Sequence, residues 1–424
     1  MTVELISVGT ELLLGNIINT NANYLSVECA KLGLSMYHQV TVGDNEARLC
    51  EAIKTALERS DIVILTGGLG PTSDDITKEA VARVIGRRLV MDEHSRERIL
   101  DYMNRIMVQN RTVPKELAKI TENNWKQVLK VEGSIVIDNE NGSAPGYIIE
   151  DNNKIIFLLP GPPVEMIPMF EGGMLPYLKK LQDKVFISRM VKICGIGEST
   201  AETMILDLIE KQGNPTIAPY AKGGEVHFRI TASADNEDDA LKLINPILDE
   251  MYSRFGINIY SVDEKETLEE AVVKLLKKHN LTIVTAESCT GGLLAGKIVN
   301  VPGASDVLKE GLITYTNEAK MKYLGVKPGT LDAYGAVSEQ TAREMAEGAL
   351  RQSGCDVSIA VTGVAGPGGG TPEKPVGLVY IACGISDKVF ISERHFKGSR
   401  EKVREYSVTA ALDLIRRSII DVYG

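Results

Sequence analysis

The sequence lacks several features that would define its class at once. Its 424 residues include six scattered cysteines with no CxxC pair, and aromatic residues make up only 5% of the chain. Such cysteines, without histidines at zinc spacing, argue against a disulfide framework and a zinc site. Apolar runs stay below the roughly 18 residues of a membrane span, and no basic leader precedes the first one. We therefore expect a cytoplasmic protein that does not interact with membranes.

Positive charge is also in deficit. The chain has 47 Lys and Arg residues against 57 Asp and Glu residues, which gives a net charge of −10. Binding to a nucleic-acid backbone depends on clustered cations, often interleaved with stacking aromatic side chains, and the sequence has no such stripe. Direct nucleic-acid binding is therefore disfavoured.

Glycine, by contrast, is abundant, with 39 residues. The glycines gather in three places that follow apolar runs: Gly67, Gly68 and Gly70; Gly291 and Gly292; and Gly363, Gly366 and Gly368 to Gly370. Glycine beside Ser, Thr and Pro at the end of a strand lets backbone amides approach a ligand. These three loops are the candidate sites.

Alternating apolar and helical segments predict an α/β sheet at the N-terminal end. Apolar strands over 3–8, 61–68 and 155–163 alternate with helical spacing over 21–33 and 47–57. Central apolar strands joined by helices indicate a parallel sheet that is covered on both faces.

The remainder of the chain predicts two further units. Residues 185–260 follow the order strand, helix, strand, strand, helix, strand, which is typical of a small split βαβ module serving as a spacer or dimerisation unit. From Thr267, a good helix cap, strands and helices alternate again up to a terminal helix over 401–420. The fold class is therefore α/β, and we place its three domains at 1–172, 173–260 and 261–424.

The first glycine loop lies in ILTGGLGPTSDDITKEA (64–80), which orders a strand end, a glycine loop and a helix. Free amides and the helix dipole at such a place favour an anion. Asp74 and Asp75 either cap the helix or hold a divalent cation against a phosphate group. Because capping alone would not require the glycines, we favour the cation.

The second loop contains two possible nucleophiles, Ser288 and Cys289, at a strand-to-helix turn. Ser288 could simply cap the helix, whereas a cysteine at a helix N-terminus could have a lowered pKa. A serine nucleophile needs a base, and GLITYTNEAK (311–320) supplies Tyr315 and Lys320. Lys320 can act as a base only if its pKa is lowered. The residues alone leave the choice between serine and cysteine open.

Residues 267–424 resemble the C-terminal domain of the CinA (competence/damage-inducible) family, a nicotinamide mononucleotide (NMN) amidohydrolase domain. The segments that carry the resemblance are AESCTGG (286–292), TYTNEAK (314–320), GAVSE (335–339), VTGVAGPGGG (361–370), KPVGLVY (374–380) and GSREKVR (398–404). The resemblance implies that Ser288 is the nucleophile, with Tyr315 and Lys320 as its activating partners.

The same resemblance implies the substrate-binding residues of this domain and a reaction without metal or other cofactor. They are Cys289, Thr290, Gly291, Thr362, Gly363, Ala365 and Arg400, of which Arg400 is the candidate phosphate contact. The run Gly366–Gly370 is either a phosphate cradle or a plain turn.

The N-terminal segments GTELLLGNIINTNANYL (9–25), TGGLGPTSDDIT (66–77), NGSAPGY (141–147) and LPGPPVEM (159–166) resemble a molybdopterin-binding-like three-layer domain, as in CinA. Leu69 and Asp74 stand where molybdopterin enzymes carry Thr and Arg, and this exchange of a phosphate clamp for a carboxylate weakens pterin binding. The resemblance implies a metal-dependent ADP-ribose pyrophosphatase. Gly67, Gly68 and Gly70 would bind the substrate, Asp74 and Asp75 the divalent metal, and Glu11 and Glu165 are weaker candidate ligands.

Together these features predict a hydrolase of pyridine-nucleotide salvage, a nicotinamide-nucleotide amidase that is also an ADP-ribose diphosphatase. Its partners would be NMN and ADP-ribose, and the resemblance implies a homodimer. Two alternatives remain at this stage: a molybdopterin-binding protein, and a non-catalytic competence or DNA-damage factor.

Overall fold

The computed structural model describes residues 1–109 and 122–424, which form two compact units. The first comprises residues 1–187 with 233–237, and the second comprises residues 188–232 with 238–424. Among the described residues, no helix is long and apolar enough to cross a membrane.

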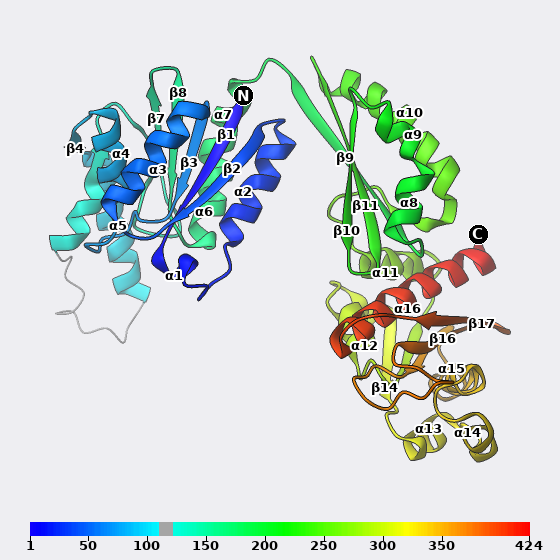
Figure 1. Cartoon of the computed structure of the whole chain (residues 1–424). Coiled ribbons are helices and arrows are strands. Elements are labelled where there is room, and N and C mark those ends of the chain that lie inside the picture. Colours follow the sequence, from blue (N-terminus) through cyan, green and yellow to red (C-terminus); the bar gives the residue numbers. More distant parts are fainter. Residues whose placement is uncertain (110–121) are drawn as a thin grey trace. The chain divides into compact units, whose positions relative to one another are not determined.

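The first unit alternates strands and helices along the chain (Figure 1). Its elements are β1 (Thr2–Val8), α1 (Thr10–Leu13), α2 (Thr20–Lys31), β2 (Ser35–Val42), α3 (Glu46–Arg59), β3 (Ile62–Thr66), α4 (Thr77–Ile85), β4 (Leu89–Met91), α5 (Glu93–Gln109), the 3₁₀ helix η1 (Glu122–Val128), β5 (Leu129–Val131), β6 (Ile135–Ile137), β7 (Gly146–Asp151), β8 (Lys154–Leu159), α6 (Pro163–Met169), the π-helix η2 (Phe170–Met174) and α7 (Leu175–Lys180).

The main sheet of this unit has six strands in the order β2-β1-β3-β8-β7-β6. The first four are parallel, but β7 and β6 are antiparallel, so the prediction of a parallel sheet is wrong at this edge. The reason is local. Only Asn152 and Asn153 join β7 to β8, and their positive φ angles of 46° and 62° form a tight turn that reverses the chain.

Two apolar layers cover the sheet because successive side chains of a strand point to opposite faces. Leu5 packs with α2, α6 and α7, whereas Ile6 packs with α3 and α4. Figure 1 shows these helices on the two faces of the sheet. The carboxyl ends of β1 and β3 meet at one edge, where the first glycine loop follows β3.

The second unit contains two sheets. Its elements are β9 (Val185–Cys194), which begins at the end of the first unit, α8 (Glu198–Met204), α9 (Leu206–Glu210), β10 (Thr216–Lys222), β11 (Glu225–Ala234), α10 (Glu237–Phe255), the 3₁₀ helix η3 (Gly256–Asn258), β12 (Ile259–Ser261), α11 (Leu268–Lys278), β13 (Ile283–Glu287), α12 (Leu293–Val299), the 3₁₀ helix η4 (Ala304–Asp306), β14 (Leu308–Ile313), α13 (Asn317–Leu324), α14 (Pro328–Tyr334), α15 (Glu339–Ser353), β15 (Val357–Gly363), β16 (Leu378–Ile385), β17 (Lys388–His395) and α16 (Arg400–Tyr423).

The smaller sheet has the order β10-β11-β9-β12, and its elements follow the predicted succession of strands and helices. The larger sheet has the order β14-β13-β15-β16-β17, with β14, β13 and β15 parallel. As predicted, Thr267 caps α11, in a reciprocal capping box with Glu270. Since both sheets belong to one compact unit, the domain boundaries at 172 and 260 stay a prediction.

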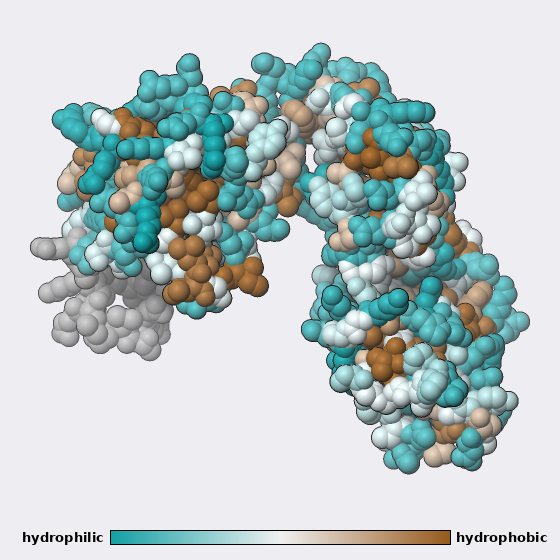
Figure 2. Space-filling view, in the orientation of Figure 1, coloured by the Kyte–Doolittle hydropathy of each residue, from teal (hydrophilic) through white to brown (hydrophobic). Residues whose placement is uncertain are grey.

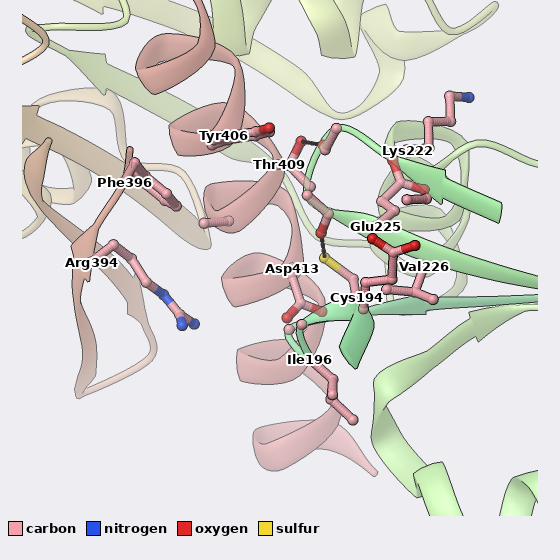
Figure 3. A pocket seen from close by; sticks show the side chains of 17 residues that line it. Cys194, Ile196, Lys222, Glu225, Val226, Arg394, Phe396, Tyr406, Thr409 and Asp413 are labelled. Atoms are coloured by element: carbon pink, nitrogen blue, oxygen red, sulfur yellow. Dashed lines mark hydrogen bonds between the residues drawn. The ribbon is translucent and has the colours of Figure 1, made fainter. Parts of the chain in front are cut away.

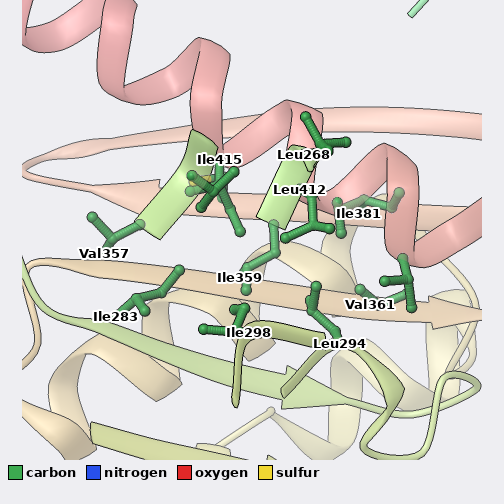
Figure 4. Packing of buried hydrophobic residues seen from close by; sticks show 14 of the residues in the cluster. Leu268, Ile283, Leu294, Ile298, Val357, Ile359, Val361, Ile381, Leu412 and Ile415 are labelled. Atoms are coloured by element: carbon green, nitrogen blue, oxygen red, sulfur yellow. The ribbon is translucent and has the colours of Figure 1, made fainter. Parts of the chain in front are cut away.

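The core of the larger sheet fixes the strand that carries the second glycine loop. Ile283, Ile359 and Ile381 project from β13, β15 and β16 toward α11, α12 and α16 (Figure 4). On those helices Leu294 and Leu412 are fully or almost fully buried. A second apolar cluster packs α15 on the opposite face. Close packing on both faces holds the carboxyl end of β13 in place.

Candidate functional sites

Ser288 directly follows β13 and lies at the carboxyl edge of the larger sheet. Its backbone N–H donates to Val361 O on β15 at 2.9 Å, and the residue is only 8% exposed. Gly292, with a φ of 94°, occupies the N-cap position of α12, so Ser288 lies four residues before that position. The interpretation of Ser288 as a helix cap is therefore wrong, and its hydroxyl is available for other contacts.

Lys320 contacts that hydroxyl. Its Nζ lies 3.0 Å from Ser288 Oγ and donates to Thr314 O at 2.8 Å. The lysine is 1% exposed, and burial lowers its pKa to about 8, since a charged ammonium is costly in an apolar surrounding. Lys320, the predicted base, thus lies against the serine hydroxyl and has a lowered pKa, and its role as a base stays a prediction.

The competing nucleophile, Cys289, lies in the apolar core behind the turn. Burial raises the pKa of its thiol to about 11. The expectation of a lowered pKa at a helix N-terminus is therefore wrong for this cysteine, because the thiol points into the core. A thiol with a raised pKa is a poor nucleophile near neutral pH.

Glu287, which the sequence analysis did not single out, shapes the turn. Its buried carboxylate accepts from the N–H groups of Gly292, Leu294 and Ala295 at 2.9, 3.1 and 2.8 Å. It thereby satisfies amides of the first turn of α12 that would otherwise be unpaired. An acidic residue at the end of an apolar strand, directly before the serine, was the signal that could have revealed it.

Two amides of the turn are not hydrogen-bonded to other described residues. Within the part of the chain that the structure describes, the backbone N–H groups of Cys289 and Thr290 donate to no other residue. The Thr290 hydroxyl is buried and likewise has no hydrogen-bond partner there. Unpaired donors beside a nucleophile can receive a developing oxyanion.

Tyr315 and Arg400 are hydrogen-bonded to each other and not to the serine. Tyr315 is 59% exposed, and its hydroxyl accepts from Arg400 at 3.2 Å. Among the described residues, no hydrogen bond joins the Tyr315 hydroxyl to Ser288; only its backbone carbonyl contacts Lys320, at 3.3 Å. Arg400 also donates to Gly366 O at 2.8 Å. The structure thus gathers Ser288 and Lys320 closely and places the other two near the third glycine loop.

Arg404 is another residue that the sequence analysis passed over, although it lies in the GSREKVR segment. Its guanidinium donates to Cys289 O at 3.1 Å and to Thr290 O at 2.8 Å, so α16 holds the serine turn from behind. Fixing two carbonyls of the turn also orients the amides of the same peptide units.

The remaining predicted residues of this site have structural contacts. Thr362 donates to Ala336 O at 2.7 Å, and Ala365 is buried in the core. A Cβ on Gly363 would lie 2.7 Å from Leu378 O, so glycine is required there by strand packing. Gly291 has a φ of 59°, which suits glycine at the turn. Their roles in substrate binding stay a prediction.

Glu287→Gln is expected to weaken both the fold and the turn. The glutamine side chain keeps the size but offers one acceptor oxygen instead of two, so the free energy of unfolding should fall by about 1–3 kcal/mol. Urea unfolding of the full chain measures this change. Exposed Glu310→Gln, which makes the same exchange on β14, is the control, and equal stability of the two variants would contradict the capping role.

In the first unit, the predicted residues of the first glycine loop line one cavity of about 340 Å³. They are Gly67, Gly68, Gly70, Asp74, Asp75, Glu11 and Glu165. Gly67 has a φ of 102°, and a Cβ there would lie 2.1 Å from Val8 O. Glycine is therefore required at this close crossing of two strand ends.

The two aspartates do not cap the helix. α4 begins at Thr77 with Ile76 as its N-cap, so the interpretation of Asp74 and Asp75 as helix caps is wrong. The Asp75 carboxylate accepts from the Thr72 N–H at 2.9 Å. A hydrogen bond from the Thr72 side chain, with a smaller contribution from nearby Lys126, lowers the pKa of Asp74. Both carboxylates belong to the loop itself, which reaches α4 through the Thr77 hydroxyl bonded to Gly67 O.

The number of carboxylates near this loop limits the kind of metal ion that it could bind. Among the described residues, no group of three or more His, Cys, Asp or Glu side chains converges on one point. Burial raises the pKa of Glu165, which accepts from Asn139 at 2.7 Å. One or two carboxylates fit a Mg²⁺ ion that is bound mainly by water and substrate phosphates, and they do not fit an all-protein cage.

An apolar surface adjoins this cavity. Leu14 and Ile18 are strongly exposed, and Figure 2 shows the apolar patch over α1 and the segment after it. A neighbouring cavity of about 280 Å³, lined by Ile17 and Ile18, shares Glu11 and Pro162 with the glycine-loop cavity. A polar loop beside an apolar surface suits a ligand with a phosphate group and a flat ring.

Fold and sites define a multidomain α/β protein with a serine–lysine pair in one unit and a glycine-loop cavity in the other. Three family models match consecutive parts of the chain: "Probable molybdopterin binding domain" over 4–180, "Damage-inducible protein CinA KH domain" over 188–261 and "CinA C-terminal domain" over 265–419. A Clostridium beijerinckii relative named as a competence-damage inducible protein is 52% identical over 99% of this chain and 100% of its own length.

A CinA-like protein of Kosmotoga olearia is 51% identical over 99% of both chains. The solved structure of competence/damage inducible protein CihA from Agrobacterium tumefaciens is 42% identical, covers 36% of this chain and 93% of its own, and has a TM-score of 0.35. The chain belongs to the CinA family, as the sequence motifs predicted.

Proposed function

We propose that the C-terminal domain hydrolyses the carboxamide of NMN to nicotinate mononucleotide and ammonia. The observation that carries this proposal is the contact of 3.0 Å between Lys320 Nζ and Ser288 Oγ, together with a lysine pKa of about 8. A lysine that is partly neutral near pH 8 can take the proton of a serine hydroxyl. Membership of the CinA family supports the amide of NMN as the substrate.

The reaction proceeds in two halves. Neutral Lys320 accepts the hydroxyl proton while Ser288 Oγ bonds to the carboxamide carbon, and the carbonyl oxygen gains negative charge beside the amides of Cys289 and Thr290. The C–N bond then breaks, and ammonia leaves with the proton from the lysine. Water, deprotonated by the same lysine, attacks the acyl-serine, releases the carboxylate and restores the hydroxyl. Every proton transfer uses a residue of this chain.

Arg400 is proposed to bind the phosphate of NMN. It is exposed at the start of α16, and its two hydrogen bonds, to Gly366 O and the Tyr315 hydroxyl, hold it near the third glycine loop. A guanidinium with free N–H groups suits a phosphate. In this arrangement Tyr315 positions Arg400 and borders the substrate, and the proton transfer is left to the lysine.

Incubation of the purified full chain with NMN tests the proposal. Ammonia and nicotinate mononucleotide should form in equal amounts, and the rate should be the same with a chelator of divalent metals. Absence of ammonia release, or release that a chelator abolishes, would contradict a serine–lysine mechanism. The expected cytoplasmic location, which rests on the scattered cysteines, and the homodimer, which rests on the family resemblance, belong to the same proposal.

We further propose that the glycine-loop cavity of the first unit hydrolyses ADP-ribose with water to AMP and ribose 5-phosphate. Gly67, Gly68 and Gly70 support this, because a loop without Cβ atoms lets amides approach a diphosphate. Asp74 and Asp75 would hold a divalent cation, which supplies charge neutralisation on the diphosphate when it is bound. Asp74, where molybdopterin enzymes carry Arg, favours this reaction over pterin binding.

Asp74→Asn is expected to lower metal-dependent AMP release from ADP-ribose by at least about 10²-fold, since a neutral amide is a weak ligand for Mg²⁺. AMP is measured with and without Mg²⁺. Asp183→Asn, an exposed aspartate of the same unit away from the cavity, is the matched control. If Asp74→Asn and Asp183→Asn release AMP equally, Asp74 is not a metal ligand, whatever the result with NMN.

A further inference from the structure

The second unit contains a cavity that is larger than the glycine-loop cavity of the first unit and has no part in the proposed reactions. It has a volume of about 540 Å³ and lies between the β10–β11 hairpin turn, the loop after β9, the end of β17 and α16 (Figure 3). Neither Ser288, Lys320 nor Arg400 lines it. A concave site of this size is typical of small-molecule binding.

Several hydrogen bonds hold the walls of this cavity together. Arg417 on α16 donates to Cys194 O at 3.0 Å and to Asn258 Oδ1 at 2.7 Å, and Thr409 donates to Gly223 O at 3.3 Å. Gly224 has a φ of 86°, and a Cβ there would lie 3.2 Å from the Thr409 methyl group. The hairpin turn thus closes tightly on α16, and the cavity is formed before any ligand binds.

Two carboxylates in the wall, Asp413 and Glu225, have hydrogen-bond partners. Asp413 pairs with Arg416 at 2.7 Å and with Arg417 at 2.6 Å. Glu225 lies 2.8 Å from His227 Nε2 and accepts from the Tyr260 hydroxyl. Asp413 is therefore neutralised by its two arginines. Although burial raises the pKa of Glu225, its hydrogen-bond partners lower that pKa by more, so Glu225 keeps its negative charge on the hairpin side. Exposed Glu198 also lies in the lining.

Two exposed cations line the wall. Arg394, near the end of β17, and Lys222, at the end of β10, are exposed, and neither forms an ion pair within the described ranges 1–109 and 122–424. Figure 3 shows the Arg394 side chain reaching into the space between β17 and α16, whereas Lys222 lies on the far, hairpin side and points away from that space. Arg394 therefore offers its guanidinium to an anion on the β17 side of the cavity, away from Glu225 and Lys222 on the hairpin side.

An aromatic surface stands beside these cations. Phe396 and Tyr406 line the cavity, and their ring centroids are 5.8 Å apart with an interplanar angle of 48°. Both rings are half-buried, so each keeps an accessible part. Flat aromatic surfaces stack on planar heterocycles, and such stacking contributes about 1–3 kcal/mol per base in nucleic-acid complexes.

We propose that this cavity binds a nucleoside monophosphate. Its phosphate would lie against Arg394, and its base would pack against Phe396 and Tyr406. An inorganic anion would contact only Arg394, and an uncharged nucleoside would contact only the rings of Phe396 and Tyr406. The ligand therefore gains from both contacts at once, and the site is separate from those proposed for NMN and ADP-ribose.

Calorimetric titration of the full chain with AMP, in the presence of a chelator, tests this proposal. We expect AMP binding that Arg394→Ala and Phe396→Leu each weaken by at least tenfold. Lys397→Ala, which removes a neighbouring exposed cation outside the cavity lining, should bind AMP as the wild type does. Adenosine and ribose 5-phosphate should each bind at least tenfold more weakly than AMP.

Several results would overturn it. They are no AMP binding by the wild type, the same isotherm for wild type and Arg394→Ala, or an equal loss in Lys397→Ala. If ribose 5-phosphate binds as tightly as AMP, the cavity binds only the phosphate. If adenosine binds as tightly as AMP, Arg394 does not contribute to binding. Circular dichroism of each variant establishes that it is folded. Because no NMN or ADP-ribose turnover enters the readout, failure here leaves the proposed functions unaffected.

Discussion

Ser288→Ala is expected to reduce ammonia release from NMN by about 10³-fold or more, because the acyl intermediate forms on the oxygen that this change removes. The substrate should still bind, since the phosphate contact and the amides of the turn do not involve the hydroxyl. The loss should therefore fall on kcat and leave KM nearly unchanged. Ammonia release under saturating NMN measures it.

The matched control is Cys289→Ala, one residue along the same turn. Cys289 is buried, and burial raises its pKa to about 11, so its thiol has no part in the proposed chemistry. Its activity should stay within about tenfold of the wild type, the loss coming only from slightly poorer packing. If the cysteine variant is inactive and the serine variant active, the nucleophile has been assigned to the wrong residue.

Lys320→Met is expected to lower kcat by about 10²–10⁴-fold, the usual contribution of a general base. Methionine matches the length and fills the buried site without a proton acceptor. Lys322→Met, on the exposed side of the same helix, is the control and should keep its activity. A Lys320→Met enzyme with nearly unchanged kcat would show that another group takes the serine proton.

The pH dependence of the wild type follows from the same lysine. Only neutral Lys320 can accept a proton, and its pKa is lowered to about 8 by burial. As the pH falls below that value the ammonium form dominates, so kcat/KM should fall about tenfold per pH unit and reach a plateau above the pKa. A rate that is constant on both sides of this pKa would contradict the assignment. The residual activity of Lys320→Met should not show this fall in kcat/KM at low pH.

The family, the α/β class and the candidate site residues could all be predicted from the sequence. Strand ends followed by glycine are local patterns, so Ser288 and the loop after β3 could be placed at sheet edges before the structure was known. Local rules also predicted the Thr267 cap correctly, because a capping box involves only neighbouring residues. They failed for Asp74 and Asp75, where the loop bends back to Thr77 before the helix begins.

The tertiary structure alone decided which of these residues meet. Lys320 is 32 positions from Ser288, and only the parallel pairing of β13 with β14 brings the start of α13 beside the serine turn. Burial lowers the pKa of Lys320, which favours its role as a base, and raises the pKa of Cys289, which makes the thiol a poorer nucleophile. Burial in turn depends on how the core packs. The cavity between the hairpin turn and α16 likewise exists only because segments nearly 190 residues apart pack together. Local sequence patterns cannot encode such contacts, because their energy depends on chain segments that lie outside any local window.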